Sequence, residues 1–264
     1  ISVITLWVVS VLIFVGTNLL PGDVAAILLG QMATPESLAA LQAKLGMDEP
    51  GYVRYFMWLG NVVTGDLGMS KAGLAQGNAS HIVDIIEPRI FNTLRLTSMV
   101  AVVAIPVALS LGLLAAMHPG TRLDRTITFS TLSLISVPEF LVATFLVLIL
   151  AVYLGWLPSI AYLRGTESGW DLIRALAMPC LTLIIVVSSQ IIRMTRATVL
   201  NVMSSPYIEM AILKGVPRRR IILRHALFNA IGPIVNVIAL NLAYLVGGVV
   251  IVEQIFAYPG LAKL

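Results

Sequence analysis

The residue types that could perform covalent or metal chemistry are few in this chain and stand far apart. The sequence of 264 residues holds one cysteine, Cys180, and three histidines, His81, His118 and His225. The histidines lie in or beside polar segments and lack the spacing of metal ligands. Cys180 follows a proline at the edge of an apolar run, with no histidine near it. A hydrolase needs a nucleophile beside a base, so this pattern disfavours a membrane-embedded hydrolase.

One acidic residue, Glu139, lies inside a long apolar run, directly after Pro138. A charge at the centre of a bilayer costs about 2.5 to 3.5 kcal/mol on insertion scales, so this side chain should face protein or water. Two roles stay open: lining or gating a translocation path, or a protonated or hydrogen-bonded acid that holds a proline kink against another helix. A lone acid without an intramembrane partner also argues against an ion-coupled secondary transporter.

Other polar side chains within apolar runs are weaker candidates for a translocation path. Interhelical hydrogen bonds average about 0.6 kcal/mol, so such residues are as often packing contacts as path residues. These candidates are Ser188, Ser189, Gln190, Asn236 and Asn241.

The polar stretch after the fourth apolar run predicts two short helices that meet at a glycine. Ser205 can cap the first helix, and Pro206 suits its first turn. Gly215 permits a backbone conformation that would strain other residues, and Pro217 can open the second helix. The cations Arg218–Arg220 that follow either anchor the chain to inner-leaflet headgroups or contact a protein partner.

The composition indicates a membrane protein. Hydrophobic residues make up 58% of the chain and charged residues 11%, and the mean hydropathy is +0.95. The pI near 9.4 could suggest nucleic-acid binding. The cations concentrate beside apolar runs and are not interleaved with aromatic residues, so we expect no nucleic-acid partner.

Five apolar runs are long enough to cross a membrane as helices, and strands of a membrane barrel would be about half as long. They cover residues 1–20, 94–117, 127–154, 176–195 and 228–252. The predicted fold class is therefore an all-α polytopic membrane protein. Its domains are a first transmembrane helix at 1–20, an extracytoplasmic module at 21–92 and a membrane core at 93–264, with a cytoplasmic helix near 206–215 between the fourth and fifth spans.

Lysine and arginine in the short loops predict the orientation, because cytoplasmic loops carry an excess of both. The loop after the second span carries Arg122 and Arg125, and the loop after the fourth span is richer still. Both loops are expected inside, and residues 21–92 and 157–176 outside. The cations assigned to the loop after the fourth span are Arg193, Arg196, Lys214, Arg218, Arg219, Arg220 and Arg224.

Expectations at the two ends of the sequence follow from the same topology. The first apolar run lacks a basic n-region and a small-residue cleavage site, so it is interpreted as a membrane span and not as a signal peptide. Five spans would leave residues 253–261 outside, and we expect a sixth span beyond them.

The polar stretch after the fourth apolar run, here called the knob, resembles the Glu-Ala-Ala-x-x-x-Gly loop of permease subunits of ABC importers. Glu209, Ala211 and Gly215 keep its spacing, with Met210 in place of the middle alanine. Further segments resemble the dipeptide, oligopeptide and nickel class of these permeases, including its form His225-Ala226-Leu227-Phe228, where the general pattern has Ile-x-Leu-Pro. These segments are Leu20-Pro21-Gly22-Asp23, Leu45-Gly46-Met47-Asp48 with Pro50, Tyr55 with Trp58, Gly65-Asp66-Leu67-Gly68 with Ser70, Arg224-His225-Ala226-Leu227 with Asn229, and Val252-Glu253 through Phe256 to Pro259-Gly260-Leu261.

The resemblance implies alternating access driven by separate ATPase subunits. The sequence has no Gly-x-x-x-x-Gly-Lys-Ser/Thr loop, so ATP and magnesium would bind in those partners, and this subunit is expected to be no enzyme and to hold no cofactor or metal. The implied partners are a second homologous permease subunit, ATPase subunits, an external substrate-binding protein and membrane lipid. The implied ATPase-coupling residues are Tyr207, Glu209, Ala211, Lys214, Gly215, Arg218 and Arg219.

The class also sets the expected location and cargo. It implies the bacterial or archaeal inner membrane and half of a translocation path. Short peptides are the expected substrate on family frequency, with nickel chelates, glutathione or haem as alternatives within the class. The external binding protein largely selects among them.

Overall fold

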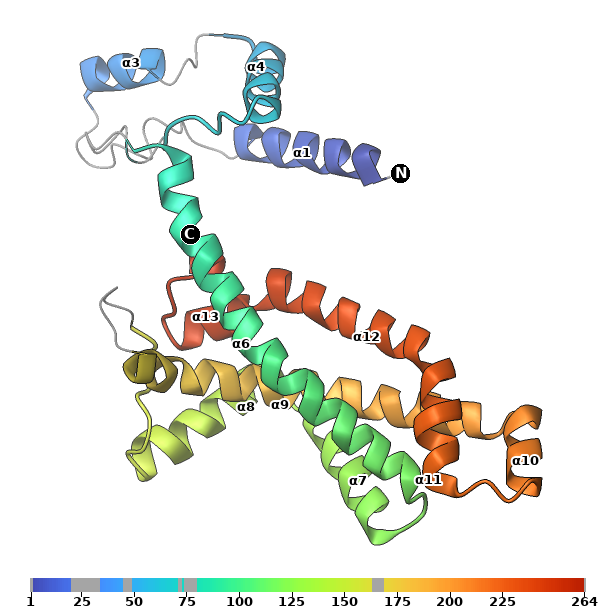
Figure 1. Ribbon diagram of the computed structural model, residues 1–264. Coiled ribbons are helices and arrows are strands. Elements are labelled where there is room, and N and C mark those ends of the chain that lie inside the picture. Colours follow the sequence, from blue (N-terminus) through green and yellow to red (C-terminus); the bar gives the residue numbers. More distant parts are fainter. Residues whose placement is uncertain are drawn as a thin grey trace. The chain divides into compact units, whose positions relative to one another are not determined.

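The computed structural model is an all-helical protein in the residues that it describes, 2–19, 34–44, 49–70, 73, 80–162 and 169–263 (Figure 1). The chain divides into two compact units, residues 1–88 and 89–264. Within the described ranges the β-type pairing is confined to an isolated bridge between Met69 and His81. The segments Leu20–Asp23 and Leu45–Asp48, quoted above for their resemblance, lie outside the described residues.

The first unit contains α1 (Ser2–Leu19), α3 (Pro35–Lys44) and α4 (Gly51–Val63). Tyr55 of α4 is buried, and its hydroxyl lies 2.8 Å from that of Ser10 in α1. The ring of Phe14, one turn further along α1, meets the Tyr55 ring edge-on with centroids 5.3 Å apart. These contacts join an apolar helix to an amphipathic one through a single aromatic side chain.

A glycine turn follows α4 in the first unit. Gly65 and Gly68 both have positive φ, +88° and +78°, which other residues adopt only with strain. The Asp66 carboxylate accepts a hydrogen bond of 2.8 Å from the Gly68 amide and so closes the turn on itself. The segment quoted above for its resemblance is therefore a locally specified turn.

The second unit is a bundle of long helices with short connections. Its chain begins within α6 and ends just after a short 3₁₀ turn. The elements are α6 (Ile82–Met117), α7 (Arg122–Ser136), α8 (Glu139–Leu146), the π-helix η2 (Val147–Tyr153), α9 (Gly169–Met203), α10 (Pro206–Leu213), α11 (Arg218–Arg220), the π-helix η3 (Ile221–Ala226), α12 (Leu227–Gly248), α13 (Val250–Ile255) and the 3₁₀-helix η4 (Leu261–Lys263).

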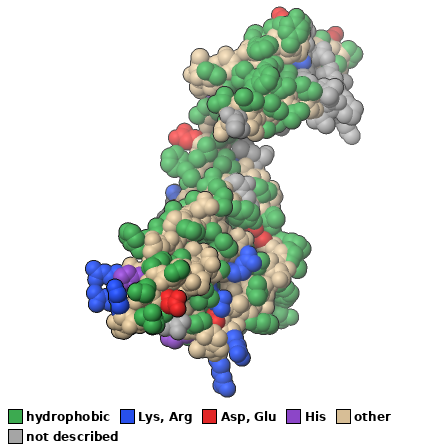
Figure 2. Space-filling view, turned by 90° about the vertical axis from the view of Figure 1, so that its right-hand side faces the viewer, with side chains coloured by type: hydrophobic (Ala, Val, Ile, Leu, Met, Phe, Trp, Pro, Cys, Tyr) green, Lys and Arg blue, Asp and Glu red, His purple; other side chains and the backbone are tan. Residues whose placement is uncertain are grey.

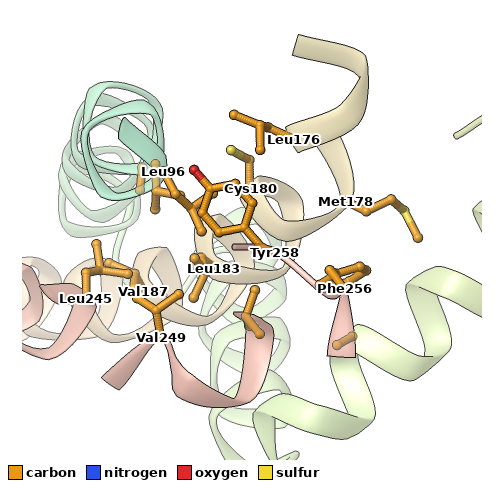
Figure 3. Packing of buried hydrophobic residues seen from close by; sticks show 14 of the residues in the cluster. Leu96, Leu176, Met178, Cys180, Leu183, Val187, Leu245, Val249, Phe256 and Tyr258 are labelled. Carbon is orange, nitrogen blue, oxygen red and sulfur yellow. The ribbon is translucent and has the colours of Figure 1, made fainter. Parts of the chain in front are cut away.

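The core of this unit forms where α6, α9, α12 and the chain after α13 meet. Leu96, Leu183, Leu245 and Tyr258 are each fully buried, and Figure 3 shows the Tyr258 ring among the side chains of the helices around it. A second buried cluster lies at the other end of α6 and α9 and includes Ala116 and Val199. The bundle therefore has an apolar core toward each end of α9.

Small residues let α6 and α9 approach closely between these cores. A Cβ atom added at Gly112 of α6 would lie 2.8 Å from the Thr195 Cβ and 3.0 Å from the Ile192 carbonyl oxygen of α9. Such contacts are shorter than packed side chains tolerate, so this crossing requires glycine.

Three helices of the described chain are long and apolar enough to span a membrane: α6, α9 and the run Ile221–Ile255. A fourth span is possible if the bent pair formed by α7 and by α8 with η2 counts as one. The apolar part of α1, Ser2–Thr17, is shorter. The all-helical fold class is confirmed, whereas the count of five spans and the module layout stay predictions.

The predicted third span, 127–154, is divided into two helices. The chain bends by 104° between α7 and the helix that starts at Glu139. Val137 has an extended backbone, with φ −91° and ψ 126°. Proline lacks an amide hydrogen and disfavours a helical conformation in the residue before it, so α7 ends at Ser136. The hydropathy of residues 127–154 indicated one span because an averaged hydropathy does not detect the break at Pro138.

The fourth span is longer than its apolar run indicated. Helix α9 covers 35 residues from Gly169 to Met203. Arg193 and Arg196 therefore lie within the helix and not in the loop that follows, which corrects the expected loop boundary. Likewise α6 begins at Ile82, so the last residues assigned to the extracytoplasmic module belong to this helix.

Apolar side chains cover much of the surface of the second unit. Figure 2 shows them over its visible face, with lysine and arginine side chains gathered near its lower end. Among the exposed side chains are Val102 on α6, Phe129 on α7 and Leu240 on α12, each more than 60% exposed. Exposure of this extent fits a surface covered by lipid or by another subunit.

The close crossing predicts opposite effects for two glycine-to-alanine changes. Gly112→Ala places a methyl group against Thr195 and is expected to lower stability by about 1–3 kcal/mol. Gly60→Ala in α4 adds a methyl group where nothing lies within 4 Å, and its better helix propensity favours a neutral or stabilising effect. Thermal unfolding of both detergent-solubilised variants measures the difference. Equal unfolding midpoints would contradict the proposed packing.

Candidate functional site

Helix α10 is a short knob with a buried inner face and an exposed outer face. Pro206 occupies its first turn, as expected from the sequence. Ile208 is fully buried in the cluster with Val199 of α9. Met210 is 54% exposed and Leu213 75% exposed. The helix is thus anchored by one side chain and presents an apolar surface outward.

The two ends of α10 are fixed differently from one another. Gly215 has φ +72°, so it adopts the conformation predicted for it. The Val216 amide donates a 3.2 Å hydrogen bond to the Ala211 carbonyl and ties the chain back on the helix. Ser205 occupies the N-cap position of α10 as expected, but its hydroxyl donates to the Val202 carbonyl at 2.6 Å and makes no capping bond to α10. A serine hydroxyl can bond the preceding turn as readily as a following amide.

A hydrogen bond between Asn229 and Tyr207 joins α10 to α12. Asn229 donates from its side-chain nitrogen to the Tyr207 hydroxyl at 2.9 Å and to the His225 carbonyl at 2.8 Å. Glu209, Lys214 and Arg219, which the sequence also assigned to this surface, are exposed. The side chain of Arg218 lies outside the described residues.

Glu139 is the first residue of α8, directly after the break at Pro138. It is 9% exposed, and one of its carboxylate oxygens accepts a 2.6 Å hydrogen bond from the Tyr244 hydroxyl of α12. Its other oxygen is buried and makes no hydrogen bond within the described chain. The amino end of a helix favours an anion, so the position stabilises part of the charge that burial disfavours.

The remaining path candidates make mostly local contacts. Ser189 donates to the Ile185 carbonyl at 2.7 Å, and Asn241 donates to the Val237 carbonyl at 2.9 Å, both within their own helices. Ser188 reaches across to the Ala104 carbonyl of α6 at 3.4 Å. Gln190 and Asn236 are exposed. None of the described hydrogen bonds of the three buried residues reaches Glu139.

Glu253, to which the sequence pattern assigned no role, lies at the centre of a hydrogen-bonded clasp. Glu253 is 1% exposed and accepts hydrogen bonds from the Thr93 hydroxyl of α6 at 2.7 Å and from the Ala262 amide at 2.8 Å. The Thr93 oxygen accepts in turn from the Leu261 amide at 3.0 Å. One carboxylate thus folds the chain after α13 back onto α6.

Neighbouring contacts complete this clasp. A Cβ atom at Gly260 would lie 1.9 Å from a Glu253 carboxylate oxygen, so the close approach requires glycine there. The Tyr258 hydroxyl donates to the Asn92 carbonyl at 2.6 Å, and the Asn92 side chain donates to the Pro259 carbonyl at 2.9 Å. Burial raises the pKa of the Tyr258 phenol above its ordinary value, so the donor stays neutral at physiological pH.

Side chains that could perform covalent or metal chemistry are sparse among the described residues. In the described part of the chain, no three His, Cys, Asp or Glu side chains gather as metal ligands. Cys180 is buried in α9. The second unit combines long apolar helices, the short helix α10 with its exposed apolar face, and buried acids at helix breaks and ends.

A bundle of long apolar helices with broad apolar surfaces defines a membrane-embedded protein. Residues 108–264 match the family described as the binding-protein-dependent transport system inner membrane component, and residues 1–97 match the N-terminal part of such membrane components. The chain belongs to this family. It is a multi-pass permease subunit of an ABC importer of the peptide and nickel class, in the inner membrane.

Similar proteins are found in distant bacteria. The chain is 34% identical over 260 residues to the glutathione transport system permease protein GsiC of Escherichia coli strain K12, covering 98% of this chain and 81% of that protein. It is 31% identical over 258 residues to the oligopeptide transport system permease protein AppB of Bacillus subtilis strain 168, covering 97% and 80%.

The clasp around Glu253 predicts a hydroxyl requirement at residue 93. Thr93→Val keeps the shape but leaves a buried carboxylate oxygen and the Leu261 amide without their shared partner, which is expected to cost about 1–3 kcal/mol. Thr93→Ser keeps the hydroxyl and serves as the matched control. Thermal unfolding of the purified permease distinguishes them, and equal losses for valine and serine would show that the hydroxyl is not what matters.

Proposed function

We propose that this permease forms half of the translocation path for short peptides in an ATP-driven importer, with α10 as its contact to an ATPase subunit. The observation that carries the ATPase contact is the exposed apolar face of α10 over its buried anchor Ile208. The substrate class is supported by relatives named for glutathione, which is a tripeptide, and for oligopeptides. Nickel chelates and haem are the alternatives within the class.

The proposed ATPase surface combines apolar and charged side chains. Tyr207, Met210 and Leu213 supply exposed apolar area, and aromatic and methionine side chains are enriched in protein interfaces. Glu209, Lys214 and Arg219 lie exposed beside them and supply charge at the rim, where it directs orientation more than affinity. ATP and magnesium would bind in the ATPase, and this subunit would contribute neither.

The proposed path is completed by a second homologous permease subunit. A long apolar bundle with exposed side chains such as Leu240 on α12 and Phe129 on α7 needs lipid or another subunit as a cover. An external binding protein would deliver the substrate to the mouth of the path. We propose no nucleic-acid partner, since the gathered cations fit inner-leaflet headgroups.

Glu139 is proposed as a residue of the path because its position combines a break with an incompletely bonded acid. The break at Pro138 allows α8 to leave the direction of α7, and the Tyr244 hydroxyl fixes one carboxylate oxygen. A carboxylate there can attract the ammonium group of a peptide as it passes. Ser188, Ser189, Gln190, Asn236 and Asn241 stay weaker proposals for the same path.

The ATPase contact predicts that Leu213→Asp abolishes coupling without unfolding the permease. A charge on the outer face of α10 opposes burial in an apolar interface. We expect loss of co-purification with the ATPase and loss of peptide uptake, with insertion and thermal unfolding unchanged. Leu223→Asp, on η3 with 43% exposure, is the control outside α10. Retained ATPase binding in Leu213→Asp would contradict the docking role.

The path role of Glu139 predicts different outcomes for two substitutions. Glu139→Gln keeps the shape and can still accept from Tyr244, so it is expected to change the rate of trialanine uptake while assembly and basal ATP hydrolysis stay intact. Glu139→Leu removes the acceptor and is expected to lower the unfolding temperature as well. Uptake into proteoliposomes and thermal unfolding are the two measurements. Uptake at the parent rate in both variants would eliminate the path role.

A further inference from the structure

A two-pronged ion pair joins α7 to α9 near one end of both helices. The Arg196 guanidinium donates from Nε to one Asp124 oxygen at 2.5 Å and from a terminal nitrogen to the other at 2.8 Å. The Asp124 side chain is 4% exposed and that of Arg196 27%. Paired bonds of this kind fix orientation as well as distance, because both groups are planar.

The same carboxylate also fixes the turn between α6 and α7. The Gly120 amide donates to Asp124 at 2.9 Å, and Gly120 has φ +75°, so the chain reverses there in a conformation that favours glycine. Thr121 is the N-cap of α7, and its hydroxyl accepts from the Asp124 amide. Asp124 therefore contacts three elements: the α6–α7 turn, the first turn of α7, and α9.

On the side of α9, this point lies close to the proposed ATPase contact. Arg196 is followed by two further helical turns, and α10 begins at Pro206. Val199 of α9 shares a buried cluster with Ile208 of α10, and the Ser205 amide donates to the Val202 carbonyl. The end of α9 and α10 are thus packed as one piece. Thr195, next to Arg196, packs against Gly112 of α6.

Helix α7, which carries Asp124 in its first turn, ends at the break before Pro138. Helix α7 runs from Arg122 to Ser136, and beyond Pro138 the chain turns by 104° into α8. Glu139, at the start of α8, is hydrogen-bonded to Tyr244 of α12. A displacement of α7 would therefore pull on Val137 and Pro138, which connect α7 to Glu139, the residue proposed for the path.

We propose that the Asp124–Arg196 pair is the joint that makes α7 move with α9 and α10 when the ATPases close, so that the motion reaches the break at Pro138. Both are positioning residues, and this inference rests on the proposed function of α10. Packed helices move as bodies, and a partly buried bidentate pair resists sliding in a way that apolar side chains do not. The alternative is that the pair stabilises the fold and takes no part in transmitting motion.

The test measures the α7–α9 distance directly in the assembled importer. Spin labels are placed on Phe129 of α7 and Met194 of α9, both exposed, in a Cys180→Ala background with one labelled permease chain per complex. Distances are recorded without nucleotide and after trapping with ATP and vanadate. Arg196→Gln breaks the pair, and Arg193→Gln, an exposed arginine on the same helix, is the matched control.

We expect one α7–α9 distance in both states of the parent and of Arg193→Gln. In Arg196→Gln we expect a broadened distribution that shifts on trapping, and at least about fivefold fewer trialanine molecules transported per ATP, within the range of couplings between contacting residues. Asp124→Asn combined with Arg196→Gln should be no worse than Arg196→Gln alone, because the pair is already broken. Asparagine retains an acceptor for the Gly120 amide.

Three results would overturn the joint. The parent distance could change on trapping, the Arg196→Gln distribution could match the parent in both states, or its transport per ATP could stay unchanged while unfolding temperature and assembly fall. Failure of trialanine to stimulate the parent complex would contradict the proposed substrate instead. The nucleotide-free distances would still decide whether the pair holds the two helices.

Discussion

The close crossing of α6 and α9 at Gly112 lies between the two apolar cores of the second unit. With the backbones this near, side chains on either side of the crossing interlock, and an apolar core forms toward each end of α9. One core surrounds Tyr258 and receives the chain after α13. The other surrounds Val199 and anchors α10 through Ile208. Helix α9 contributes side chains to both cores and so links them within one element.

Features that depend on residues close together in the sequence were predictable from it. The apolar runs gave α6, α9 and α12, and the glycine and prolines of the knob gave α10 and its left-handed turn at Gly215. The break after Ser136 was also encoded locally, by Pro138, but hydropathy averaged over it. The Glu253 clasp and the Asp124–Arg196 pair join residues 160 and 72 positions apart. Nothing in one sequence states that such residues meet, so these contacts were out of reach.

Three buried acids show three solutions to the same electrostatic problem. Asp124 is paired with a guanidinium, Glu253 accepts from a hydroxyl and an amide, and Glu139 has one hydroxyl donor and a helix end. A buried charge is costly unless it is fully bonded. The first two acids tie separate elements together, whereas one Glu139 oxygen makes no hydrogen bond within the described chain, which is the capacity that the proposed path role would use.

The helix breaks differ in how completely the acids next to them are hydrogen-bonded. Helices α7 and α8 part at Pro138, and α12 and α13 part at Val249, whereas α9 continues through its own Pro179 without a break. Bending on transport should concentrate where backbone hydrogen bonds are already interrupted, because no further bonds need be lost in a medium without water. The clasp holds the chain beyond the second break against α6. If the permease works by alternating access as proposed, the first break, next to the least completely bonded acid, is where its two arrangements can differ at the lowest cost.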